Sequence, residues 1–192
     1  MCSRSPQDVE KMKPCTTGRH LTLRGTVDIA DKNLLTNHQI FEFESNDLTK
    51  GWVVDYCYVW CSSPGGAVSS DGQGIFESAL ATDKIKIPGG VATSFPASDN
   101  RLIGWLIQGA NLRSAGDMAS FQGSSFADGT RMTIDPDHII NRDLFLNFYS
   151  ITDPSQSPVR EWSYLVGLSP VKLSPAESVL SMVKGVAQDI DN

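Results

Sequence analysis

Apolar and polar residues alternate along much of this 192-residue chain, with the two-residue period that is typical of half-buried β-strands. In residues 19–27, for example, Leu21, Leu23 and Val27 share one face. Similar runs cover residues 39–45, 75–81, 83–89, 101–109, 129–135, 138–149 and 160–173. Since turn residues separate them without a β-α-β rhythm, the sequence predicts an all-β fold: an antiparallel β-sandwich, jelly roll or barrel of about eight to ten strands.

Residues 51–61 depart from simple alternation because both faces of the run are largely apolar. The even-numbered positions from Trp52 to Trp60 hold only tryptophan, valine and tyrosine. On the odd-numbered face, Asp55 is the one charged residue of the run. This pattern predicts a strand that is central in a sheet or covered on both sides. Residues 62–74 and 110–129 are rich in glycine and serine, which predicts two long loops.

One helix is predicted at the C-terminal end of the chain. Ser174 is the expected N-cap, Pro175 suits the first helical position, and Glu177 completes a capping box. The expected apolar stripe consists of Val179, Met182, Val183, Val186 and Ile190, with Leu180 beside it. Two interpretations stay open, because this stripe could close one end of its own sandwich or dock on a neighbouring subunit.

Charge divides the chain into three parts. Residues 1–24 carry a net charge of +3, whereas the whole chain carries −6. We therefore expect a flexible, mildly basic arm over residues 1–18, a sandwich domain over residues 19–173, and a helix and tail over residues 174–192. The acidic body is not typical of a DNA-reading domain, and the arm predicts at most a weak contact with nucleic acid. No apolar run approaches the length of a transmembrane segment.

Candidate chemistry concentrates in the stretch Asp135-Pro136-Asp137-His138. Pro136 fixes its own backbone and biases Asp135 towards an extended shape, and aspartates bond to nearby backbone N–H groups in turns. The favoured interpretation is a turn that feeds a strand. A calcium-type oxygen site and an acid/base site are the alternatives. If the chain were a hydrolase, Asp55 would join these two aspartates and the histidine as the first residues to substitute.

Other chemical motifs are missing from the sequence. Cys2, Cys15, Cys57 and Cys61 have neither a C-x-x-C pair nor a histidine at zinc-finger spacing. The last two are expected to be buried free thiols, because strand residues four apart cannot bridge each other. His20, His38 and His138 lie far apart, and no nucleophile, zinc or phosphate-binding motif occurs. The sequence thus predicts no enzyme, no catalytic or metal residues, and no cofactor.

The tryptophans offer a second kind of site. Trp52, Trp60, Trp105 and Trp162 could form a sugar-stacking platform on one face of a sandwich, next to calcium at Asp135 and Asp137. Their aliphatic neighbours make core or subunit contacts the favoured interpretation. A lectin-like, carbohydrate-binding module is kept as the alternative function.

Two segments carry a resemblance to a known group of proteins. The runs DPDHIINRDLFLNFY (residues 135–149) and SPAESVLSMVKGVAQDIDN (residues 174–192) are similar to parts of structural proteins of small, mostly marine, uncultured viruses. The whole arrangement resembles a virion protein of the single-jelly-roll kind. The resemblance implies a capsid or accessory capsid component that is located in the virion and binds copies of itself and other virion proteins. The arm is less basic than those of shell proteins that bind genomes directly, so genome packaging is not predicted.

Overall fold

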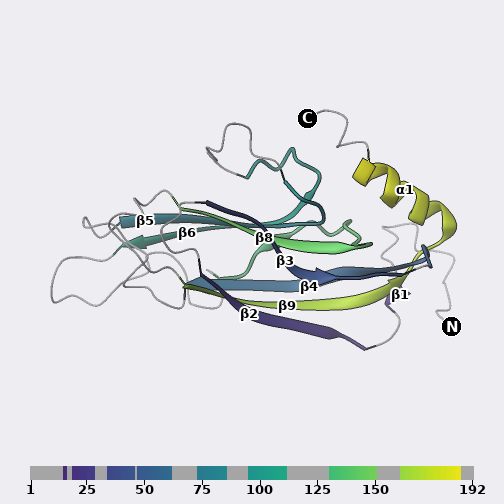
Figure 1. Cartoon of the computed structure of the whole chain (residues 1–192), viewed down its shortest axis with the longest axis horizontal. Helices are drawn as coiled ribbons and strands as arrows, with labels where there is room; N and C mark the ends of the chain where they lie inside the picture. Colours follow the sequence, from purple (N-terminus) through teal and green to yellow (C-terminus); the bar gives the residue numbers. More distant parts are fainter. Residues whose placement is uncertain are drawn as a thin grey trace, which may run out of the picture.

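The computed structural model describes residues 15–16, 19–28, 34–45, 47–61, 73–85, 95–111, 130–150 and 161–186. These residues form nine strands and one helix. Figure 1 shows the strands in two layers, with the helix at one end. The predicted all-β antiparallel sandwich is confirmed.

Sheet A is built around β9 (Glu161–Lys172). One edge of β9 pairs with β2 (Leu21–Asp28) and with the short β1 (Cys15–Thr16). Its other edge pairs with β4 (Lys50–Cys61). All these pairings are antiparallel, and β2 follows β9 over its full length without a register shift.

Sheet B has the order β3-β8-β5-β6-β7. Its strands are β3 (Leu34–Glu42), β5 (Gln73–Ala81), β6 (Leu102–Asn111), β7 (Thr133–Ile134) and β8 (Asp143–Ser150). The register of β3 against β8 shifts twice, near Asn37 and near Ile40. Asn37 also adopts a left-handed backbone conformation, with a φ of 60°.

The core lies between the two sheets and follows the alternation seen in the sequence. In β9, Trp162, Val166 and Leu168 face inwards; opposite them, Leu144, Leu146 and Phe148 come from β8. The ring of Trp162 packs against those of Phe76 and Phe148. These residues are almost completely enclosed, so their apolar burial stabilises the fold.

One side of the sandwich is closed by residues 130–142, which we call the closing segment. Its β7 part pairs with β6 of sheet B, and Asp135 N–H donates to the Ile103 carbonyl oxygen at 2.8 Å. Its two ends bond to β4 of sheet A: the Met132 N–H donates to the Cys57 oxygen, and Ile140 and Trp52 exchange two backbone bonds. The segment thus covers the neighbouring edges of both sheets.

Three strand predictions need correction. Residues 83–85 are not in a strand, because Ile85 bonds through its N–H and C=O to the side-chain amide of Asn37 instead of to a ladder. Of residues 129–135, only Thr133–Ile134 form a strand. The long strand expected from residue 138 begins at Asp143, because Ile140 bonds to the opposite sheet before the chain bends into β8. Of the two predicted loops, residues 62–72 and 112–129 lie outside the described residues, whereas residues 73–74 belong to β5 and residues 110–111 to β6.

The predicted helix is confirmed as α1 (Pro175–Val186). Ser174 N–H donates to Glu177 Oε2 at 2.7 Å, and Glu177 N–H donates to Ser174 Oγ at 3.3 Å, so the predicted capping box forms. Within the described part of the chain, no helix has both the length and the apolar character needed to cross a bilayer. Of the predicted arm, only Cys15 and Thr16 lie among the described positions before residue 19.

Candidate functional site

The aspartate-histidine stretch lies in the middle of the closing segment. Asp135 Oδ1 accepts a hydrogen bond from the N–H of Asp137 at 3.0 Å, and the chain turns at Pro136 and Asp137. This is the aspartate-stabilised turn that the sequence predicts. The turn carries the chain from its pairing with β6 back towards β4.

His138 uses both of its ring nitrogens to bond to backbone. Nε2 accepts a hydrogen bond from the N–H of Val54 at 2.7 Å, and Nδ1 donates to the carbonyl oxygen of Asp135. The imidazole therefore stands where a backbone partner would otherwise continue the ladder along β4. Because it is 7% exposed, burial lowers the pKa of His138, against the opposing influence of nearby aspartates. A neutral ring with both nitrogens occupied has none left to move a substrate proton.

Asp55 lies next to Val54, but its carboxylate contacts Ser169 and His20. The register of β4 against β9 shifts between Val54 and Tyr56, which leaves Asp55 unpaired in the bulge. Its Oδ2 accepts a hydrogen bond from Ser169 Oγ at 2.5 Å and lies 3.3 Å from His20 Nδ1. Asp55 therefore does not form one site with Asp135, Asp137 and His138, because its hydrogen-bond partners are different residues.

Ser169, His20 and Asp55 bring together the residue types of a hydrolytic triad, but with a different geometry. Ser169 Oγ donates to the carboxylate and lies 2.7 Å from the same His20 Nδ1 that approaches Asp55. In a working triad, the histidine bridges serine and carboxylate through its two different nitrogens, and the serine oxygen is open to substrate. Ser169 is fully buried, so its hydroxyl is closed to a substrate.

Metal ligands do not converge among the residues that the structure describes. No three histidine, cysteine, aspartate or glutamate side chains in these ranges gather closely enough to share an ion. Asp135 and Asp137 are joined by a side-chain-to-backbone bond within the turn. The calcium alternative therefore gains no support from the described residues.

The tryptophans lie largely among apolar neighbours. Trp162 is buried in the core, and Trp52 packs edge-to-face against Phe41 and Phe43. The indole nitrogens of Trp52, Trp105 and Trp162 are enclosed, without a hydrogen-bond partner in the described part of the chain. Trp52, Trp60 and Trp105 are half-buried, and the ring contacts of Trp52 and Trp162 favour the predicted core and contact role.

Cys57 confirms part of the cysteine prediction. Its side chain is completely buried between the sheets as a free thiol, and burial raises the pKa of that thiol. A neutral, enclosed thiol is neither a nucleophile nor a metal ligand. The side chain of Cys61 and all of Cys2 lie outside the described residues.

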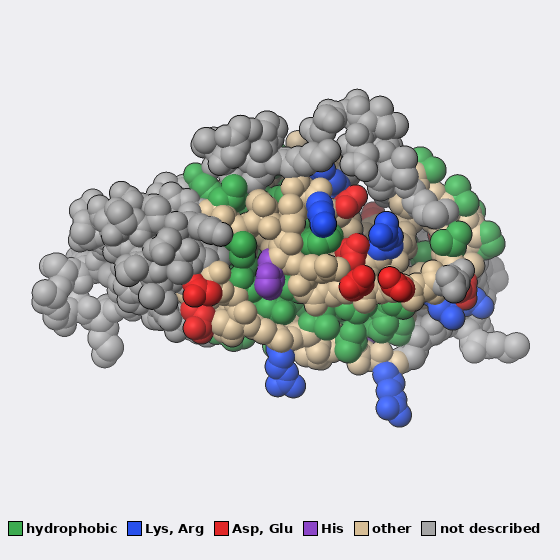
Figure 2. Space-filling model, in the orientation of Figure 1, with side chains coloured by type: hydrophobic (Ala, Val, Ile, Leu, Met, Phe, Trp, Pro, Cys, Tyr) green, Lys and Arg blue, Asp and Glu red, His purple; other side chains and the backbone are tan. Residues whose placement is uncertain are grey.

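The surface of α1 is the most unusual feature of the molecule. Ser178, which is 5% exposed, faces the body and donates from Oγ to the carbonyl oxygen of Leu48, and Ser181 Oγ accepts a bond from Asn141. The apolar side chains of the helix that the structure describes face away. Leu48, Val179, Leu180 and Val183 are each more than half exposed, and we call these four residues the helix patch. Figure 2 shows apolar side chains over α1 at the right-hand end.

Among the described residues, five large apolar side chains are exposed, and four of them belong to the helix patch. The fifth is Ile107 on β6. Of the predicted stripe, Val179 and Val183 are exposed together with Leu180 beside it, and the other members lie outside the described side chains. Ser178 lies 130 residues from its partner Leu48, and Ser181 lies 40 residues from Asn141. The sequence therefore gives no signal that these two serines face the body and so turn the apolar side of the helix outwards.

The chain matches no protein-family model, and it matches no curated protein.

Proposed function

We propose that this chain is a virion structural protein, a subunit that assembles with copies of itself into part of a viral shell. The helix patch is the observation that carries the proposal. A monomer gains nothing by turning valine and leucine outwards while it turns serine inwards, whereas a subunit buries such a patch against its neighbour. Second copies are the proposed occupants, because one patch on each identical subunit can be covered in a closed assembly.

The strand pairing supports a jelly-roll form of the sandwich. From β2 onwards, the strands pair in a nested order: β2 with β9, β3 with β8, β4 with the β7 region, and β5 with β6. The third pair rests on the bridge between Tyr58 of β4 and Arg131 near β7. Such nesting is that of one long antiparallel hairpin rolled into two sheets, the form used by many viral shell proteins.

The fold by itself does not decide the function, because lectins and cupins share jelly-roll architecture. His138 has both ring nitrogens bonded to backbone, and the hydroxyl of Ser169 is buried against Asp55. The packing of Trp52 and Trp162 against other aromatic rings weakens the lectin alternative. The proposal therefore depends on association between copies and not on a pocket.

Mass photometry and sedimentation velocity of the purified full chain at micromolar concentration test this proposal. We expect oligomers or particles whose population rises with concentration. Leu180→Gln combined with Val183→Gln should weaken association by roughly 10–100-fold, since burying two half-exposed aliphatic side chains contributes about 1.5–3 kcal/mol. Glutamine is chosen because it maintains helix propensity.

Ile107→Gln is the matched control, since it removes the exposed aliphatic residue that lies outside the helix patch. It should leave association unchanged. A strictly monomeric parent protein that also fails to copurify with particles from its native source would contradict the proposal.

A further inference from the structure

Sheet A carries a row of four side chains that comes from three strands and the closing segment. Arg24 of β2 is aligned with Leu165 of β9, and Leu165 is aligned with Tyr58 of β4. Tyr58 in turn forms an antiparallel bridge with Arg131 of the closing segment. Directly opposed residues place their side chains on the same face of a sheet, so Arg24 and Arg131 stand at the two ends of the row. We call these four residues the arginine row.

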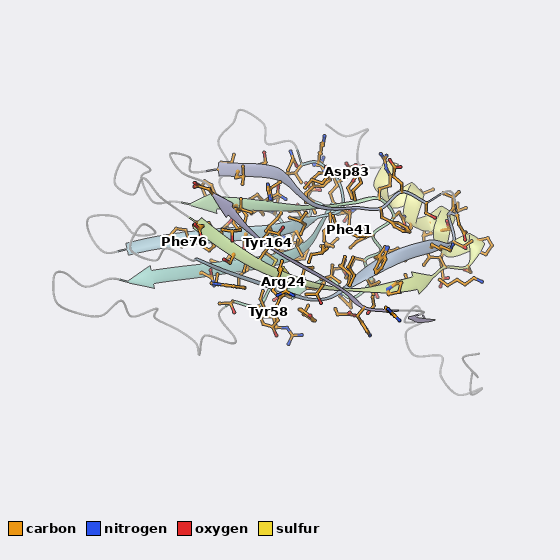
Figure 3. All side chains as sticks on the ribbon, turned by 60° about the horizontal axis from the view of Figure 1, so that its bottom comes forward. Arg24, Phe41, Tyr58, Phe76, Asp83 and Tyr164 are labelled. Atoms are coloured by element: carbon orange, nitrogen blue, oxygen red, sulfur yellow. The ribbon has the colours of Figure 1, made fainter. Side chains whose placement is uncertain are left out.

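The arginine row lies on the outer face of sheet A. Cys57 and Val59, the neighbours of Tyr58 in β4, are completely buried in the core, whereas Tyr58 is half-buried. Arg24 and Arg131 are exposed. Figure 3 brings the lower side of Figure 1 forward and labels Arg24 and Tyr58. Because sheet B packs on the opposite face, the row belongs to a surface that the sandwich core does not use.

The two guanidinium groups of the arginine row have no partner in the described part of the chain. The ion pairs and side-chain hydrogen bonds there involve other residues. Arg101 shows the contrast, since its guanidinium binds the carboxylate of Asp99 through two bonds of 2.9 and 2.8 Å. Arg24 and Arg131 therefore keep this bidentate capacity for a carboxylate from outside the chain.

Tyrosine rings form an apolar surface between the two arginines. The ring centroids of Tyr56 and Tyr58 are 5.7 Å apart. The ring of Tyr56 lies over Gly167 of β9, where an added Cβ would stand only 2.3 Å from the ring. Glycine at this position therefore gives the ring room to lie across the neighbouring strand. Together with Leu165, the two rings offer a partly exposed surface for an apolar group beside two cations.

Acidic residues near the row favour a ligand with isolated acidic groups over a polyanion. Asp55 precedes Tyr58 in β4 and Glu161 precedes Leu165 in β9; because these strands are antiparallel, the two acids lie on opposite sides of the row. The whole chain also carries −6. Like-charge repulsion therefore disfavours a polyphosphate. The flat face of a sheet offers no backbone groups to an extended peptide, whereas the hydroxyls of a sugar donate to carboxylates and its C–H face packs on aromatic rings.

We propose that the arginine row binds an acidic oligosaccharide. One sugar ring covers Tyr58 and Leu165, and its carboxylate bonds to the guanidinium group of Arg24 or Arg131. This surface differs from the tryptophan platform considered above, because tyrosines form it and the carboxylate is held by arginine instead of by calcium. The inference does not rest on the proposed self-assembly, since it uses none of the helix-patch residues.

Titration with matched pairs of sugars, followed by NMR on the full chain, tests the role of the carboxylate. The probes are sialyllactose and trigalacturonate, each compared with its own methyl ester, which keeps the rings and most hydroxyls but removes the negative charge. At least one of the two acids should bind, and its ester should bind roughly 10–100-fold more weakly, as expected for the loss of hydrogen bonds to a charged group. Equal binding of acid and ester, or binding of neither acid, would overturn the proposal.

Substitutions in the row test the location of the site. Arg24→Gln combined with Arg131→Gln should weaken binding of the acid roughly 10–100-fold and leave binding of the ester unchanged. Tyr58→Leu should weaken binding of both acid and ester by roughly two- to tenfold, because it removes a ring from under the sugar. Arg142→Gln is the matched control, since Arg142 is an exposed arginine outside the row, and it should change neither affinity. Equal effects of the row and control substitutions would contradict the assigned site.

The outcomes separate this inference from the proposed function. A monomeric parent protein that binds the acid supports the sugar site and contradicts only self-assembly. An assembling protein that binds neither acid overturns the sugar site alone. A thymidine oligonucleotide that binds more tightly than either sugar, and that loses affinity with the two arginine substitutions, would overturn the sugar assignment and give the row to nucleic acid.

Discussion

The closing segment and α1 use their most informative residues in opposite ways. In the closing segment, His138 and Asp135 resemble chemistry, yet their bonding groups are directed inwards to Val54, Asp137 and the segment itself. In α1, Val179, Leu180 and Val183 resemble core residues, yet they face away from the body while serines make the inward contacts. The difference shows that residue type indicates what a side chain can do, whereas its partners decide whether that capacity remains available to another molecule.

The largest effect is expected from His138→Ala. The change leaves the buried N–H of Val54 and the carbonyl oxygen of Asp135 without the imidazole, and it opens a space beside β4. Unsatisfied buried backbone groups and lost packing should lower the free energy of unfolding by about 2–4 kcal/mol. Urea denaturation measures this change.

His20→Ala is the control for that experiment, because the side chain of His20 is 73% exposed. Its removal should cost less than about 0.5 kcal/mol. If the two substitutions had equal effects on unfolding, the structural role of His138 would be wrong, and the contrast between an inward-bonded histidine and an outward-facing one would disappear.

Acidification should weaken the closing segment through the same ring. Burial lowers the pKa of His138 in the folded protein below the ordinary value of 6.5. Above pH 6.5 both states are neutral and the full stability is present. As the pH falls below 6.5, the unfolded chain binds a proton that the folded chain excludes, so stability declines until the pH reaches the lowered folded-state pKa.

Denaturation curves at pH 7.5 and 5.5 check this expectation, with His138→Gln as a variant that cannot titrate at this position. The parent should lose more stability than the variant between these two values. This loss is smaller than that of His138→Ala, since the folded protein keeps the ring neutral and its bonds intact. Parallel losses in both proteins would refute the assignment to His138.

Alternation and capping signals are local, and they predicted much of this fold. The inward faces of β2 and β9 and the capping box of Ser174 and Glu177 follow directly from the order of residues. The long strand expected from residue 138 was wrong, because Ile140 satisfies its backbone across the sandwich on β4. Alternation reports which face is apolar, but it does not report which sheet supplies the hydrogen bonds.

Long-range polar partners explain the remaining differences. Ser169 and Asp55 are 114 residues apart, and Asn37 lies 110 residues before Asn147. Neither pair has a sequence motif, since its members meet only after the sheets have formed. The turn at Asp135 could be predicted because its bond spans two residues. The sequence could not predict that the apolar side of α1 faces outwards, because this orientation depends on the contact between Ser178 and the distant Leu48.

The smallest effect is expected from Leu180→Ala, measured at a concentration where the protein is monomeric. Leu180 is 59% exposed, and alanine favours helices, so the free energy of unfolding should change by less than about 0.5 kcal/mol. Leu146→Ala makes the same chemical change at a fully buried position of β8 and should cost about 2–5 kcal/mol. A large loss at Leu180 would mean that α1 stabilises its own sandwich through its apolar face. A negligible loss leaves that face free to stabilise contacts between subunits.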